Sequence, residues 1–186
     1  MEKRDLMNER LDRFEKTLEE GLLKICRMEG LADEMLASPD IDARWDAFIK
    51  DYVADAVTNF NEYPQAAIGF AGFLGMAVAC LWDRDWELCR NLPYRTFYGP
   101  RGFDDMDDHI VQDVLGLGPE KASKVSSAIN SCAIACLELL RHEGIETQTA
   151  YGFYALSRCY SVLYRIGEAI ELTSLGYHRE AVGDNC

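Results

Sequence analysis

The feature that most constrains the fold is a run without a charged residue, 63–82, in a chain of which 27% of residues are charged. As a helix, the nearly apolar part, 66–82, would span ~25 Å at 1.5 Å per residue. A bilayer core needs ~30 Å of strongly apolar helix, whereas this run is rich in glycine and alanine and is closed by Pro64 and Asp83. We therefore expect a buried central helix rather than a membrane span. Gly69, Gly72 and Gly75, spaced by three, predict that another backbone approaches it closely.

Hydrophobic residues at helical spacing extend over most of the chain, and no period-two alternation persists. The sequence predicts an all-α, single-domain helical bundle, residues 1–186, with five or six helices and more than about half of its residues helical. The expected long helices cover 3–28, 41–63, 64–91, 119–143 and 149–175, with shorter ones over 31–36 and 105–115.

The composition bears on partners and compartment. A length of 186 residues and a hydrophobic fraction of 48% suit one packed domain, and the net charge of −13 opposes binding to nucleic acid or to an anionic membrane surface. The N-terminus is charged from its second residue and has no apolar segment of the secretory type. With this start, the seven cysteines indicate reduced thiols in a cytoplasmic protein.

The segment 92–103, LPYRTFYGPRGF, is the first candidate site. Its prolines and glycines oppose a regular helix, and aromatic rings in a loop need a surface to cover them. Two interpretations stay open: a lid that seals the end of the bundle, or the wall of a ligand site formed by Tyr94, Tyr98 and Arg101.

Four aspartates and a histidine follow within 104–109. Asp104 is a good helix N-cap, and Asp107 falls at the capping-box position. The alternatives are a hard cation, although the spacing of a Ca²⁺ loop is missing, or a ligand contact through Asp105 and His109.

Arg158 and Arg165 lie one heptad apart in the last long helix and are flanked by tyrosines. Such a pair suits a carboxylate or a phosphate, which suggests a small anionic ligand. The alternative is structural pairing with the helix 41–63, because the segment 31–63 has eight acids and two bases.

The chain has none of the usual catalytic or metal-binding spacings. There is no Glu-x-x-His pair, Cys132 and Cys136 are four residues apart and so make no Cys-x-x-Cys, and no nucleophile elbow or phosphate loop occurs. We expect no metal and no cofactor, and the cysteine pair to be core packing.

These features predict a non-catalytic cytosolic bundle protein that binds a partner or a small ligand, with a homodimer formed through the apolar helix 66–82 or a neighbouring face. The alternative is a small-molecule enzyme with a pocket between 92–109 and the last long helix. A filled junction there favours the first, and a titratable Asp or His with a shifted pKa beside a cavity favours the second. The predicted ligand-binding residues are Tyr94, Tyr98, Arg101, Asp105, His109, Arg158 and Arg165.

Overall fold

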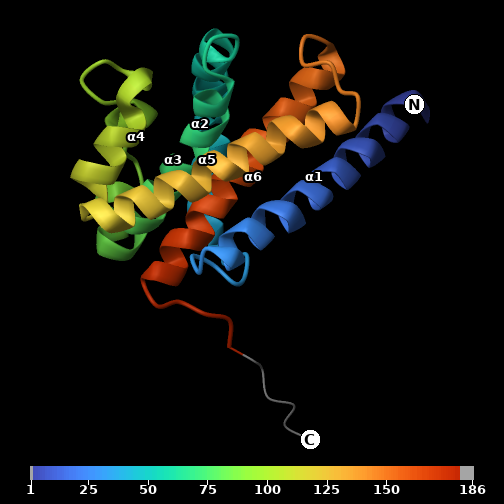
Figure 1. Cartoon of the computed structure of the whole chain (residues 1–186). Coiled ribbons are helices and arrows are strands. Elements are labelled where there is room, and N and C mark those ends of the chain that lie inside the picture. The colour runs from blue at the N-terminus through green and yellow to red at the C-terminus, as the bar shows by residue number, and fades with distance from the viewer. Residues whose placement is uncertain (1, 181–186) are drawn as a thin grey trace, which may run out of the picture.

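The computed structural model describes residues 2–180, and its regular secondary structure is helical (Figure 1). The six α-helices are α1 (Glu2–Met28), α2 (Pro39–Asn59), α3 (Pro64–Cys89), α4 (Met106–His109), α5 (Pro119–His142) and α6 (Ala150–Ser174). Residues 2–180 contain no strand, only an isolated bridge between Gly99 and Gly102. The predicted all-α class is confirmed.

Proline begins three of these helices: Pro39, Pro64 and Pro119 each stand in the first turn of α2, α3 or α5. The missing proline N–H has no intrahelical partner to lose there, and the fixed φ suits helical geometry. Each of these prolines therefore marks the residue at which a long helix begins.

Helix α3 is the centre of the bundle. All of residues 67–80 are buried, and α2, α5, α6 and the turn Ile110–Val114 contact the helix from different sides (Figure 1). It is long and apolar enough to cross a membrane, but 78% of its most apolar 18-residue stretch is buried inside the fold. Because neighbouring helices of the same chain already cover this stretch, its apolar surface gives no reason to expect a dimer through 66–82. A dimer through a neighbouring helix face stays a prediction.

The glycines of α3 let α6 approach as predicted. A Cβ built at Gly75 would overlap the backbone carbonyl of Tyr164, and one built at Gly167 would overlap the carbonyl of Gly72. Gly69 faces α5 more loosely, because its Cβ would stand 3.4 Å from Ile129. At this α3–α6 crossing the two backbones meet with no side chain between them.

Two short predicted helices are wrong. Residues 31–36 form bends and coil, and the predicted helix 105–115 is a succession of a 3₁₀ turn, the single turn α4 and a π-helical turn over Ile110–Val114. The predicted capping by Asp104 is also wrong, because Asp105 occupies the N-cap position of α4 and its side chain makes no capping hydrogen bond. The Asp105 carboxylate instead accepts the backbone N–H of Arg101.

The six described cysteines are free thiols, and five of them are buried, Cys132 and Cys136 among them. The prediction that this pair packs in the core is confirmed. The seventh, Cys186, lies outside the described residues.

Candidate functional site

The aromatic loop after α3 packs onto α2. Tyr94 and Phe97 lie in one 3₁₀ turn and Phe103 begins another, and all three rings are buried. The ring centroid of Phe48 on α2 lies 5.8 Å from that of Tyr94 and 5.9 Å from that of Phe97. This part of the loop therefore covers the bundle, as expected for a lid.

Asp55 of α2 holds the loop through two phenols. The hydroxyl of Tyr94 donates to Oδ2 of Asp55 at 2.9 Å, and the hydroxyl of Tyr98 donates to the same oxygen. Burial and then these contacts with Asp55 raise the pKa of Tyr98 to about 12 and that of Tyr94 further. Both phenols stay protonated at neutral pH and act as hydrogen-bond donors that fix the loop.

Asp105 closes the loop on itself. Its carboxylate accepts the backbone N–H of Arg101 at 3.0 and 3.1 Å, and Nε of the same arginine lies 3.4 Å away. A Cβ at Gly99 would overlap this carboxylate, so glycine is required there. Predicted as a ligand contact, Asp105 is only 6% exposed and is occupied by the loop backbone.

His109 pairs within its own segment. Its Nδ1 lies 2.8 Å from Oδ2 of Asp113, one turn further along the chain. The partner is 69% exposed at its side chain, so this pair lies at the surface.

Arg158 and Arg165 bind acids of α1. Glu15 bridges them, with Oε1 2.6 Å from Nη2 of Arg165 and Oε2 bonded to Arg158. Asp12 lies 3.1 Å from Arg158, and Glu19 lies 2.7 Å from Arg165. The structural-pairing alternative named the wrong partner, the helix that is α2. The acids of α1 at i and i+4 fall beside the arginines instead, because α1 packs along α6 (Figure 1).

The seven predicted residues therefore separate into a loop group and an α6 group. Tyr52 of α2 lies between the two regions: its ring centroid is 5.7 Å from that of Phe103 and 5.5 Å from that of Tyr160 on α6. Its hydroxyl donates to the carbonyl of Ala67 at 2.7 Å. The junction that was expected to hold a pocket is filled by this aromatic side chain.

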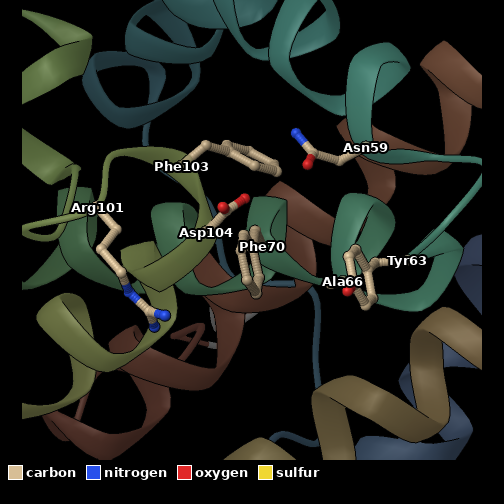
Figure 2. Close-up of a pocket in the computed structure, with 7 residues that line it drawn as sticks. All are labelled: Asn59, Tyr63, Ala66, Phe70, Arg101, Phe103 and Asp104. Carbon is tan, nitrogen blue, oxygen red and sulfur yellow. The ribbon is translucent and has the colours of Figure 1, made fainter.

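The cavity at the loop opens on its other side, toward the turn between α2 and α3. It has a volume of about 270 Å³ and is lined by Asn59, Tyr63, Ala66, Phe70, Arg101, Phe103 and Asp104. Figure 2 shows the polar groups of Asn59 and Asp104 near the Phe103 ring, with Arg101 and Tyr63 at opposite edges.

A second cavity of about 300 Å³ continues the first along α3, and both are lined by Tyr63, Ala66 and Phe70. We call the two together the turn groove. Its further lining residues come from α3, α4 and α5 and from the α2–α3 turn: Glu62, Pro64, Gln65, Gly69, Phe73, Asp107, Ser126, Ile129 and Asn130.

Carboxylates outnumber cations in the turn groove. Glu62, Asp104 and Asp107 line it, against a single arginine, Arg101, whose side chain is 75% exposed. Partial burial raises the pKa of Asp107. The floor is apolar, since Phe70 and Phe103 are buried with ring centroids 5.1 Å apart.

Sequence reasoning reached only part of this groove. It named Arg101 as a ligand contact and singled out the segment that contains Phe103 and Asp104, but it missed Asn59 and Tyr63. The available pointer was Tyr63–Pro64, where the chain breaks before α3 and leaves the tyrosine 61% exposed. A single exposed tyrosine is common on protein surfaces, so this pointer gains weight only from the cavity beside it.

Among the described residues, no three His, Cys, Asp or Glu side chains gather into a metal-binding group. No protein-family model, no curated protein and no solved structure matches the chain. The turn groove is therefore the feature of the molecule from which we infer a function.

Proposed function

We propose that this protein is a non-catalytic binding protein whose turn groove holds a cationic group carried on an apolar body. An organic amine and a lysine or arginine side chain of a partner share this chemistry. The observation that carries the proposal is an aromatic floor flanked by three carboxylates and one arginine, in a chain with a net charge of −13.

The two parts of the groove favour the two parts of such a ligand. Apolar pockets with a few polar groups at fixed positions are the usual form of small-ligand sites, and burial of the apolar body supplies most of the affinity. A cation gains further from carboxylates and from the face of an aromatic ring. Tyr63, exposed at the groove edge, offers such a ring beside Glu62.

The arginines argue against the small anionic ligand expected from the sequence. Arg158 and Arg165 are bonded to carboxylates of α1, and Arg101 contacts Asp105. An anion at Arg158 and Arg165 would have to displace the carboxylate of Glu15, and an anion at Arg101 would meet the three carboxylates of the groove wall. A cationic ligand of the turn groove disturbs none of these pairs, so we propose it in place of the anion.

A filled junction between the loop and α6 supports binding without catalysis. Tyr52 occupies the place where the enzyme alternative needs its pocket. One observation favours that alternative: Asp107 lines the turn groove, and burial raises its pKa, as a general base would require. An enzyme would in addition need a second reacting group close to it, and His109 is paired with Asp113 instead.

The first test compares three probes of similar size and different charge. Benzylamine is cationic, benzyl alcohol is neutral and benzoate is anionic. In a protein NMR titration we expect benzylamine to shift the backbone amides of Asn59, Gln65 and Asn130 saturably, with weaker binding of the alcohol and none of benzoate. Equal binding of benzoate at these amides contradicts the proposal.

Two substitutions test the carboxylates. Asp104→Asn and Asp107→Asn each remove one charge from the groove wall and should weaken benzylamine binding ~2–5-fold, the range of a partly exposed ion pair. Asp51→Asn is the matched control, because Asp51 is exposed on α2 and lines none of the described cavities. If all three variants change the affinity equally, only the overall charge of the protein acts and the groove is not the site.

A further inference from the structure

A separate cavity lies beyond the C-terminal end of α2. Its volume is about 290 Å³, close to the lower end of the range for small-molecule sites. Three segments form it: the end of α2 with the turn that follows, the loop before α6, and the first turns of α6. Its lining residues are Val57, Phe60, Asn61, Thr147, Gln148, Phe153, Leu156 and Tyr160. None of them lines the turn groove.

No residue that lines this cavity carries a charge. The adjoining cavity, which shares Phe60, Asn61, Thr147 and Gln148 with this one, adds the charged residues Arg141 and Glu146 to its wall. The other three described cavities also have charged walls, with Arg101, Asp107 and Arg158 respectively. In a protein with a net charge of −13, an uncharged wall suits an uncharged ligand, because burying a charge without a partner is costly.

Tyr160 is the buried polar side chain among the residues that line this cavity. The residue is 1% exposed, and its hydroxyl has no hydrogen-bond partner among the described residues. The other two fully buried tyrosines of the core are satisfied: Tyr52 donates to the carbonyl of Ala67 at 2.7 Å, and Tyr164 donates to that of Ile41 at 2.9 Å. Buried hydroxyls are nearly always paired, and a partner for this one could come from the cavity that Tyr160 lines.

The residues that line the cavity indicate which kind of ligand could accept a hydrogen bond from Tyr160. Burial raises the pKa of Tyr160, so the phenol keeps its proton and can donate. Val57, Phe60, Phe153 and Leu156 offer apolar surface around it. Asn61 and Gln148 are exposed and stand at the rim, where a second polar contact is available.

We propose that this cavity is a second binding site, for a small uncharged molecule with a ring-sized apolar body and one hydroxyl or carbonyl oxygen. The oxygen accepts the hydrogen bond of Tyr160, and the apolar body lies against Phe153 and Leu156. The site is independent of the turn groove, so either can exist without the other.

Phenol and toluene test the proposal, because they have the same size and differ in one hydroxyl. Ligands with so few non-hydrogen atoms bury little surface, so millimolar affinity is expected. In NMR titrations of the wild-type protein, phenol should shift the amides of Asn61, Thr147 and Gln148 saturably and bind more tightly than toluene. Absence of saturable shifts, or shifts at the turn groove alone, overturns the proposal and means that only water meets the Tyr160 hydroxyl.

Tyr160→Phe is the decisive variant, since it keeps the ring and removes the hydroxyl. We expect it to weaken phenol binding ~2–10-fold, the range of one net hydrogen bond, and to leave toluene binding unchanged or tighter. Tyr164→Phe is the matched control: it removes a buried hydroxyl that lines no described cavity, so the protein loses stability while its affinity for phenol stays the same. Equal losses of phenol and toluene affinity in Tyr160→Phe contradict the hydrogen bond.

Phe153→Ala gives a different pattern at the same site. Phe153 is 43% exposed, so its truncation should leave the protein folded. The loss of an apolar wall should weaken both probes alike, whereas Tyr160→Phe affects only phenol. A Phe153→Ala protein that binds both probes as the wild type does would also refute this location.

Discussion

The α3–α6 crossing and the turn groove use the same helix in opposite ways. At the crossing, Gly75 and Gly167 bring two backbones into contact, and no atom can be added without moving a helix. At the N-terminal end of α3, Phe70 forms the floor of an open groove whose edge residue Tyr63 is 61% exposed. The crossing thus fixes the arrangement of the helices, and the groove is left free to contact something else. Substitutions at the crossing should therefore change stability, and substitutions in the groove should change binding.

The largest expected effect is that of Gly167→Ala. The new methyl group would overlap the carbonyl of Gly72, and neither backbone can turn away as a side chain would. We expect a loss of at least ~3 kcal/mol in the free energy of unfolding, the upper end for overpacked cores, measured by urea denaturation. Gly21→Ala is the control: Gly21 has nothing within 4 Å of its Cβ position, so there the helix propensity of alanine should stabilise by ~0.5–1 kcal/mol. A wild-type midpoint for Gly167→Ala would show that the crossing is looser than described.

Glu168, next to this glycine, gives the crossing a pH dependence. The residue is fully buried, and its Oε1 accepts the N–H of Ser38 at 2.6 Å while Oε2 has no partner in the described part of the chain. Burial raises the pKa of Glu168 to about 8; the Ser38 N–H and Arg165 lower it, and the nearby Asp42 raises it. The folded state therefore keeps a proton that the unfolded chain loses near its ordinary pKa of 4.5.

The sign of the effect follows from this difference. The contribution of Glu168 is fully present below about pH 4.5 and is lost as the pH rises to about 8. Glu168→Gln keeps an acceptor for Ser38 and cannot ionise. At ~1.4 kcal/mol per pKa unit, the shift from 4.5 to about 8 sets an upper limit of about 5 kcal/mol, and we expect the variant to be more stable than the wild type by on the order of 2–4 kcal/mol above pH 8. The two proteins should converge near pH 4. Parallel stability curves in denaturation series across this range would contradict a neutral Glu168.

Substitutions in the part of the loop that covers the bundle should reduce the free energy of unfolding by smaller amounts. Tyr94→Phe removes a buried hydrogen bond to the Asp55 carboxylate and should cost ~1.5–3 kcal/mol, the range for a bond to a charged group. Tyr98→Phe removes the neighbouring bond from a half-buried ring and should cost less. Urea denaturation of both variants gives the comparison. A larger loss for Tyr98→Phe would mean that the outer phenol, not the inner one, holds the loop on α2.

The contrast between the two regions also explains what the sequence could predict. Buried helices leave a local pattern, so the central helix and its glycine contact with another backbone followed from 63–82 alone. The partner of Arg158 could not be predicted in this way, because acidic residues occur at suitable spacing on both α1 and α2. The packing of α1 along α6 determines that the acids of α1 form the ion pairs. The turn groove combines residues about 30 to 70 positions apart, such as Asn59, Arg101 and Asn130, and no local sequence pattern predicts that they meet.

Arg101→Ala has the smallest expected effect and separates the two views of the groove most directly. The backbone N–H of residue 101 donates to the Asp105 carboxylate whatever the side chain at that position. The Arg101 side chain is 75% exposed, and its Nε lies 3.4 Å from the same carboxylate. Loss of such a surface contact should change the free energy of unfolding by less than ~0.5 kcal/mol.

Its effect on binding depends on the charge of the ligand. If the groove takes a cation, removing the only arginine of its wall removes a repulsion, and benzylamine should bind about twofold more tightly at low ionic strength, with the gain falling as salt screens it. If the arginine is instead the anchor of an anionic ligand, as the sequence suggested, the same variant binds benzylamine as the wild type does and loses any affinity for benzoate. Titration of both probes against the wild type and Arg101→Ala therefore decides the sign of the ligand charge: a gain in benzylamine affinity supports a cationic ligand, and a loss of benzoate affinity supports an anionic one.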